Sequence, residues 1–190
     1  MPNQRSPAIV SALVTALLLS GVVTACARDS NEATATSQVS SQTPSTVERQ
    51  DTTQCGTATA TSTAELTNIT SGRHDTFDRI VLTFAGPEPA CSASFVNQIV
   101  ADGSGQPISL DGNAFLEVTL RGAAAHNDAG KLTYNGPGVI DTPELENIRA
   151  VSLAGDFEGY VTIGLGMNMK THYAVFALSG PTRVVIDVGR

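Results

Sequence analysis

Tryptophan is absent from this 190-residue chain, and the other aromatic residues are only six Phe and three Tyr. A core built from this composition must be mostly aliphatic. Basic residues are also few: 11 Lys and Arg stand against 18 Asp and Glu, which gives a net charge of −7. Such a protein does not attract nucleic acid, and an anionic membrane repels its body. We therefore expect no nucleic-acid partner and no polybasic contact with a membrane.

Histidine is scarce too, and His74, His126 and His172 lie far apart in the chain. No two of them form a zinc-binding pair such as H-E-x-x-H, and no G-x-S-x-G motif marks a serine nucleophile. The oxygen donors within 102–113 do not complete an EF-hand calcium loop, because the closing Glu is missing. The sequence thus predicts a protein that is not an enzyme, with no catalytic residue, metal site or cofactor.

The N-terminal apolar run, Ala8 to Val23, has 16 residues and is too short to span a bilayer, which takes about 20. It follows a lone Arg5 and ends in Val23-Thr24-Ala25-Cys26. This layout resembles a bacterial lipoprotein signal, in which residues 1–25 are cleaved and the cysteine sulfur is lipidated. An ordinary secretory signal and an uncleaved anchor are the alternatives.

Lipidation at Cys26 would attach the chain to the membrane through palmitate-type acyl chains. Two or three such chains anchor a protein stably, whereas one binds only marginally. The predicted location is therefore the extracytoplasmic face of the cell membrane, with the lipid as the membrane contact.

Two cysteines remain, Cys55 and Cys91. In an exported chain they indicate a disulfide, because the compartment permits one and an unpaired exposed thiol is a liability. The closed loop of about 36 residues would stabilise the fold by roughly 3–4 kcal/mol. Two separate free thiols are the alternative.

Residues 27–64 are rich in Ser and Thr, contain no aromatic residue and show no apolar periodicity. Such a composition cannot form a core. Taken over Ala27 to Gln54, it predicts a flexible tether with a root-mean-square length of about 30 Å. The predicted organisation is a signal peptide over 1–25, Cys26 and a linker over 26–64, and one folded domain over 65–190.

The folded part has a β pattern throughout, with short apolar segments separated by turn residues. In one of them Ile80, Leu82 and Phe84 share one face. This pattern predicts an all-β domain, a sandwich of two small sheets. Only Thr142 to Asn147 indicates a short helical turn, with Thr142 as its cap. The predicted strands are Phe77 to Phe84, Ala93 to Val100, Ile108 to Leu110, Phe115 to Arg121, Ile148 to Leu153, Tyr160 to Leu165, Tyr173 to Leu178 and Arg183 to Val188.

The order of four motifs resembles the AMIN-like lipoproteins of actinobacteria. These motifs are Gly72 to Arg79, Asp102 to Gly105, Gly155 to Gly159, and a terminal strand, Pro181 to Val188, that is similar to the closing strand of AMIN domains. The resemblance covers roughly residues 66 to 190. It implies a β-sandwich without a cofactor that binds or localises at the cell wall without catalysis. Together with a tether able to reach into the wall, it leads us to expect peptidoglycan or an associated glycan as ligand. No catalytic domain follows the module, so we do not expect the targeting arm of an amidase.

A protein-interaction module is the alternative function. It would recruit or regulate another envelope protein, such as a wall hydrolase, through an exposed strand edge.

Two polar clusters and one tyrosine are candidate ligand-binding residues. Arginine donors and carboxylate acceptors suit sugar hydroxyls and the charged groups of peptide stems, and a tyrosine ring suits stacking on a sugar. The candidates are Arg73, His74, Asp75, Asp78 and Arg79, then Asp156 and Glu158, and Tyr134 in the long connection over 122–142.

A structural role is the interpretation we favour for these residues. Arg79 or Arg183 would pair with Asp78, Asp156 or Asp187 and fasten one sheet to the other. The segment around Tyr134 would be a flap that covers the edge of the sandwich.

Overall fold

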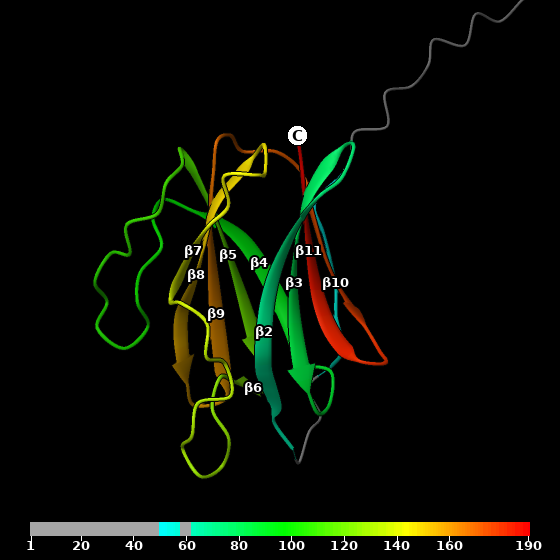
Figure 1. Cartoon of the computed structure of the whole chain (residues 1–190), viewed down its shortest axis with the longest axis vertical. Coiled ribbons are helices and arrows are strands. Elements are labelled where there is room, and N and C mark those ends of the chain that lie inside the picture. The colour runs from blue at the N-terminus through cyan, green and yellow to red at the C-terminus, as the bar shows by residue number, and fades with distance from the viewer. Residues whose placement is uncertain (1–49, 58–61) are drawn as a thin grey trace, which may run out of the picture. The chain divides into compact units, whose positions relative to one another are not determined.

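The computed structural model describes residues 50–57 and 62–190. These residues form two β-sheets that pack face to face, and none of them lies in a helix (Figure 1). No helix long and apolar enough to cross a membrane is found among them. The predicted all-β sandwich is confirmed. The predicted signal peptide, Cys26 and most of the predicted tether lie outside the described residues.

The first sheet has six strands in the order β1, β10, β11, β3, β2, β6. Neighbouring strands are antiparallel except for the pairs β1–β10 and β2–β6, which are parallel. The strands are β1 (Thr52–Gln54), β2 (Ala64–Arg73), β3 (Phe77–Ala85), β6 (Ala123–Ala124), β10 (Tyr173–Leu178) and β11 (Thr182–Gly189).

The second sheet has five antiparallel strands in the order β4, β5, β9, β8, β7. They are β4 (Ala90–Val96), β5 (Ala114–Arg121), β7 (Val139–Asp141), β8 (Ile148–Phe157) and β9 (Tyr160–Met167). The long hairpin of β8 and β9 lies at the centre of this sheet, with the short β7 at one edge.

The core lies between the sheets and is mostly aliphatic, as predicted. Ile80, Leu82 and Phe84 point into it from β3, and each is at most 3% exposed. On β11, Val185 points away from the core but is also buried, because it lies in register between Val81 and Phe176 of the neighbouring strands. The outer surface of the six-stranded sheet therefore has an apolar patch of its own.

Strand β2 is not predicted by the sequence, and the reason is a break in its alternation. Its register against β3 shifts between Leu66 and Asn68. Ala64 and Leu66 are buried before the shift, whereas Ile69 is buried after it, so that no single period of two covers the strand. The short strands β1, β6 and β7 were also not predicted, and β1 lies within the stretch predicted to be tether.

Three local predictions are wrong. Ile108 to Leu110 is not a strand, because it belongs to a loop that packs Leu110 onto the second sheet. The strand predicted over 93–100 runs instead over 90–96. Residues 142–147 form turns rather than a helical turn, and the buried Thr142 hydroxyl donates to the carbonyl oxygen of Ile148 at 2.9 Å instead of capping a helix.

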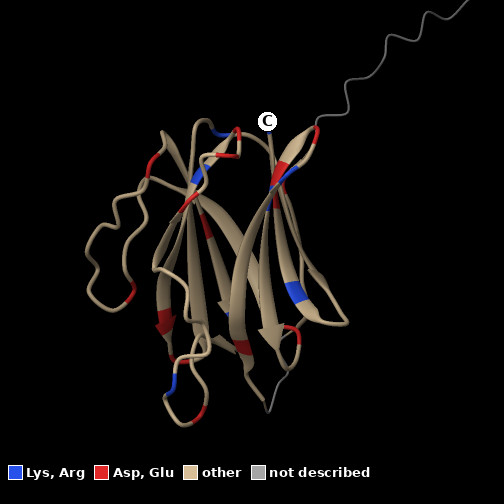
Figure 2. Cartoon of the chain, viewed as in Figure 1, with Lys and Arg blue, Asp and Glu red and all other residues tan. Residues whose placement is uncertain are grey.

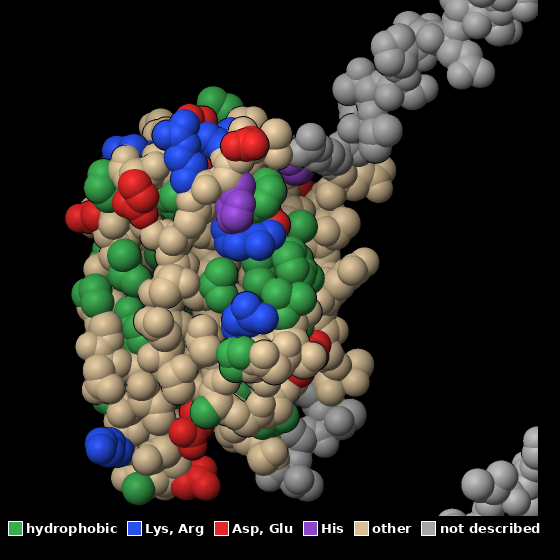
Figure 3. Space-filling model, turned by 45° about the vertical axis from the view of Figure 1, so that its right-hand side comes forward, with side chains coloured by type: hydrophobic (Ala, Val, Ile, Leu, Met, Phe, Trp, Pro, Cys, Tyr) green, Lys and Arg blue, Asp and Glu red, His purple; other side chains and the backbone are tan. Residues whose placement is uncertain are grey.

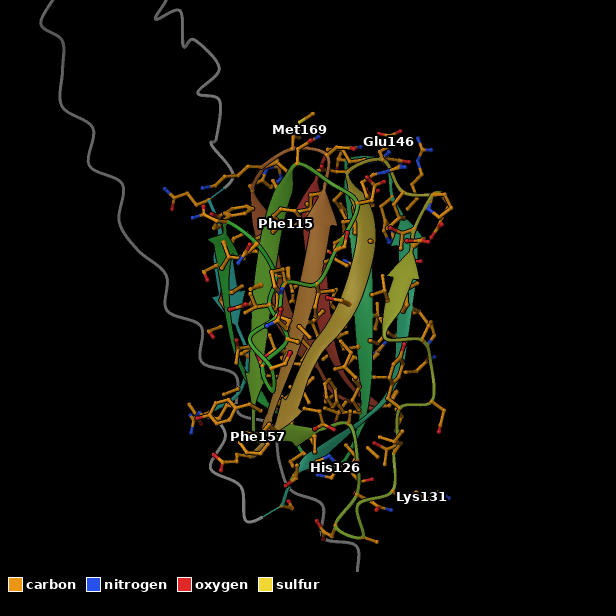
Figure 4. The ribbon with its side chains drawn as sticks, turned by 90° about the vertical axis from the view of Figure 1, so that its left-hand side faces the viewer. Phe115, His126, Lys131, Glu146, Phe157 and Met169 are labelled. Atoms are coloured by element: carbon orange, nitrogen blue, oxygen red, sulfur yellow. A yellow bond between two sulfur atoms is a disulfide. The ribbon has the colours of Figure 1, made fainter. Side chains whose placement is uncertain are left out.

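The loop over 97–113 covers the outer face of the five-stranded sheet (Figure 4). Ile99 and Leu110 pack there against Ala150 and Ala154. The loop lies flat because glycines face it from β8 and β9: a Cβ atom at Gly164 would lie 2.5 Å from the Ile99 side chain. No described segment covers the six-stranded sheet in this way, so the two outer faces differ.

The predicted disulfide between Cys55 and Cys91 is confirmed, with the two Cα atoms 5.5 Å apart. Cys55 directly follows β1 of the first sheet, and Cys91 lies in β4 of the second. The bond therefore joins the two sheets covalently.

Candidate ligand-binding surface

The two predicted polar clusters lie at opposite ends of the sandwich. Residues 73–79 surround the turn between β2 and β3, whereas Asp156 and Glu158 lie at the turn between β8 and β9. Strand β8 separates them, and its ten residues span about 30 Å. Figure 2 shows that charged residues gather mostly at these two ends. One ligand of ordinary size cannot contact both clusters.

Asp78 is a buried structural residue and is not part of a binding surface. It is fully buried, and its Oδ2 atom accepts hydrogen bonds from the backbone N–H groups of Asn147 at 2.6 Å and Ile148 at 3.1 Å. Asp78 belongs to the first sheet, and Ile148 begins β8 of the second. This carboxylate therefore fastens one sheet to the other, although through backbone donors rather than through the expected arginine.

Arg79 pairs with Asp187, but within one sheet. Its Nε and Nη2 atoms donate to the two carboxylate oxygens at 2.6 and 2.7 Å, across the register of β3 and β11. The hydrogen bond to Asp187 raises the pKa of Arg79. The two parallel hydrogen bonds fix the orientation of the guanidinium on the outer face of the sheet.

Two aromatic rings lie near this guanidinium. The Arg79 Cζ atom is 5.1 Å from the ring centre of Phe77 and 5.8 Å from that of Phe176. His74 stacks on Phe77 with ring centres 4.5 Å apart. We call His74, Phe77, Arg79 and Phe176 the stacked row.

The stacked row crosses the uncovered face of the six-stranded sheet. Val81 and Val185 extend the apolar area beside it, and the Nε atom of Arg183 is buried there without a hydrogen-bond partner among the described residues. Figure 3 shows this side of the molecule, with hydrophobic side chains gathered between basic side chains and a histidine. Flat rings together with an oriented guanidinium provide stacking and hydrogen bonding on one surface.

A polar hollow of about 420 Å³ adjoins the stacked row at the end of the sheet. Glu146 forms ion pairs there with Arg73 and with Arg190, the latter at 2.8 Å. The hydrogen bond from Arg190 lowers the pKa of Glu146. His74 lines the hollow as well as belonging to the row, so the two features are continuous. The residues that line the hollow are Arg73, His74, Asp75, Glu146 and Arg190.

At the other end of the sandwich Asp156 organises the chain after β5. Its carboxylate accepts a hydrogen bond from the N–H of Ala125 at 2.9 Å and contacts Nδ1 of His126 at 2.7 Å. Glu158 is exposed in the tight β8–β9 turn, with a φ of 49°. Asp156 therefore has internal partners, and these two acids do not form a joint site.

Tyr134 does not offer a ring for stacking. Its side chain is 6% exposed, burial raises the pKa of its hydroxyl, and that hydroxyl donates to the carbonyl oxygen of Pro137 at 3.0 Å. Tyr134 is therefore not available to stack on a sugar. Its ring packs in the core, which favours the interpretation of this segment as a covering flap.

The described residues contain no group of three His, Cys, Asp or Glu side chains that could hold a metal ion. The three histidines occupy separate places: His74 stacks on Phe77, His126 contacts Asp156, and His172 contacts Thr171. The oxygen donors within 102–113 are also used separately, since Asp102 accepts from Thr162 and Asp111 pairs with Arg149.

A family model described as the AMIN-like domain matches residues 64–190, two thirds of the chain. The chain belongs to the AMIN-like domain family. The match begins with β2 and includes every strand except β1. No curated protein and no solved structure was found to match. Membership associates the chain with binding modules of the cell envelope.

In this AMIN-like domain the structure adds four residues to the predicted candidates. Phe77 and Phe176 occupy outward positions of β3 and β10, where the alternation of each strand could have indicated them. No sequence pattern indicates Glu146 and Arg190 as candidates, because only the folded topology brings them beside Arg73. Of the predicted candidates, the structure brings together Arg73, His74, Asp75 and Arg79.

Proposed function

We propose that this chain is an exported, lipid-anchored protein whose AMIN-like domain binds peptidoglycan or an associated envelope glycan without catalysis. The ligand contacts the stacked row and the adjoining polar hollow. The observation that supports this proposal best is an uncovered face of the six-stranded sheet on which the rings of Phe77 and Phe176 both lie near the fixed guanidinium of Arg79.

The chemistry of this surface fits a glycan with charged substituents. Phenylalanine faces pack against the C–H faces of sugar rings, and the surrounding polar groups bind hydroxyls. The arginines of the hollow suit carboxylates, such as those of a peptide stem, because a guanidinium binds a carboxylate in bidentate fashion. Arg79 is already fixed by Asp187, so that it loses little conformational freedom when a ligand binds.

Truncating the stacked row is expected to weaken wall binding. The double variant Phe77→Ala/Phe176→Ala removes both rings, and we expect about a tenfold loss of affinity for purified cell-wall sacculi in a sedimentation assay. Phe157→Ala is the matched control, because Phe157 is 64% exposed at the opposite end and its loss leaves the row intact.

Three results would contradict this assignment. One is no retention of the wild-type protein on sacculi above a control protein. The second is equal loss in the double variant and in Phe157→Ala. The third is unchanged binding in the double variant with an unchanged melting temperature.

Lipidation is tested separately at Cys26. Cells that express the chain and take up a clickable palmitate analogue are expected to label it, and Cys26→Ala is expected to abolish the label and move the protein from the membrane fraction to the soluble fraction. The double variant Cys55→Ala/Cys91→Ala should keep the label, because it removes only the cysteines of the disulfide and retains Cys26. Label on Cys26→Ala would refute the lipid anchor.

A further inference from the structure

Strand β2 has a free edge over most of its length. It runs from Ala64 to Arg73, but the parallel partner β6 pairs only with Ala64 and Glu65 on that side. No other described strand lies against the remaining residues of this edge. Proteins usually protect such an edge with charges or proline, yet 68–72 reads Asn-Ile-Thr-Ser-Gly, with neither. The bulge between Leu66 and Asn68 protects only the beginning.

A groove lined by four aliphatic side chains and by Thr70, Ser71 and Thr142 opens beside this free edge. It has a volume of about 320 Å³ and lies between β2 of the first sheet and β7 of the second. Ile69 and Ile80 line it from the first sheet, and Ile140 and Val151 line it from the second. Ile80 and Val151 are at most 1% exposed and form its floor. Side chains entering the groove would thus contact the core of the sandwich.

Two hydrogen bonds limit the length of the free edge. The Thr133 hydroxyl donates to the carbonyl oxygen of Leu66 at 2.8 Å, and the Ser71 hydroxyl donates to Glu144 at 2.7 Å. The five residue steps from Leu66 to Ser71 span about 17 Å. This length accommodates an added strand of about five residues.

The charge beside the groove selects the partner. Asp141 at the end of β7 and Glu144 in the following turn are both exposed. The neighbouring arginines already have acidic partners, Arg73 with Glu146 and Arg149 with Asp111. The chain as a whole carries a net charge of −7, which disfavours a second copy at this acidic edge.

We propose that the free edge of β2 binds an extended, cationic segment of a partner protein by strand addition. The backbone of the segment pairs with β2, alternate aliphatic side chains enter the groove, and Lys or Arg side chains lie against Asp141 and Glu144. This surface is separate from the stacked row, so that strand addition does not depend on glycan binding.

The test uses the purified full chain in a non-ionic detergent and two labelled peptides. One has the sequence Lys-Val-Thr-Val-Thr-Lys, and the other has Glu in place of both Lys. Fluorescence polarisation is expected to give at least about tenfold tighter binding of the Lys peptide. Hydrogen exchange is expected to slow at backbone amides within 67–72 when that peptide binds.

Charge reversal locates the contact. Asp141→Lys/Glu144→Lys is expected to weaken binding of the Lys peptide by about tenfold. Asp128→Lys/Glu88→Lys makes the same change in net charge at exposed positions away from the groove, and its affinity is expected to stay within about twofold of wild type.

Three outcomes would overturn the proposal. The first is no binding of the Lys peptide at millimolar concentration, with both charge variants still folded by circular dichroism. The second is equal weakening in the two charge variants, which would show a response to net charge alone. The third is a dimer in sedimentation whose formation protects 67–72, which would assign the edge to a second copy of this chain.

Discussion

The Asp78→Ala variant is expected to lose about 3–5 kcal/mol of unfolding free energy, measured by urea denaturation. The substitution leaves the buried N–H groups of Asn147 and Ile148 without an acceptor, and each unpaired group costs about 1–3 kcal/mol. It also removes the negative charge 3.8 Å from the Nε atom of Arg190, whose side chain is 10% exposed. Because small domains are stable by only about 5–15 kcal/mol, this one carboxylate accounts for a large share of the total.

Two further variants separate the causes of this loss. Asp78→Asn keeps an acceptor oxygen for the two N–H groups but removes the charge. Its loss of unfolding free energy should therefore be smaller than that of Asp78→Ala. Asp75→Ala removes an exposed carboxylate three residues away and should change stability by less than about 0.5 kcal/mol. Equal stability of the Asp78 and Asp75 alanine variants would refute the role of Asp78 as the link between the sheets.

Much of the fold can be predicted from sequence because it depends on local alternation. Ile80, Leu82 and Phe84 share the buried face of β3, as a period of two requires. The prediction fails where the period is interrupted, as at the bulge of β2, or where segments are too short to show a period, as in β1 and β7. It also fails at 108–110, whose apolar residues cover a sheet from outside instead of joining one.

The candidate site depends on non-local pairing, and the sequence predicts it only in part. The identity of Arg79 indicates a carboxylate partner, but only the antiparallel register of β3 and β11 selects Asp187. The pairing of β10 with the other edge of β11 brings Phe176 beside Arg79, although the two are nearly one hundred residues apart in the chain. Asp78 and Arg79 are neighbours in sequence, yet one is buried between the sheets and the other lies on the outer face. Local polarity cannot separate these two roles, whereas strand alternation can.

Glycine residues explain why a loop covers the outer face of one sheet and not that of the other. Gly155, Gly164 and Gly166 leave the outer face of the second sheet smooth, and Asp102, Ile99 and Leu110 of the loop over 97–113 occupy the space that side chains would fill. The first sheet instead presents the large side chains of Phe77, Arg79 and Phe176 at outward positions. One outer face is therefore covered by the chain itself, whereas no described segment covers the stacked row on the other.

Removal of the disulfide is expected to lower the free energy of unfolding by about 3–4 kcal/mol. The Cys55–Cys91 bond closes a loop with a sequence separation of 36 residues, and this constraint reduces the conformational entropy of the unfolded chain. The variant for this measurement is Cys55→Ala/Cys91→Ala, followed by urea denaturation. Its folded state should change chiefly at β1, because the three exposed residues of that strand pair only with β10 at the edge of the sheet.

Hydrogen exchange and a matched control separate the effect of the disulfide bond from the effect of side-chain contacts near the two cysteines. Amides of β1 and its partner β10 should exchange faster in the cysteine variant, whereas those of the central strands β3 and β11 should keep their order of protection. Thr53→Ala/Ser92→Ala alters exposed neighbours of both cysteines, retains the bond, and should cost less than about 1 kcal/mol. If both double variants lost the same stability, side-chain contacts near β1 and β4 would explain the effect, and the covalent link would not. A large loss confined to the cysteine variant would instead assign the effect to the covalent link, which stabilises the fold by restricting the unfolded chain.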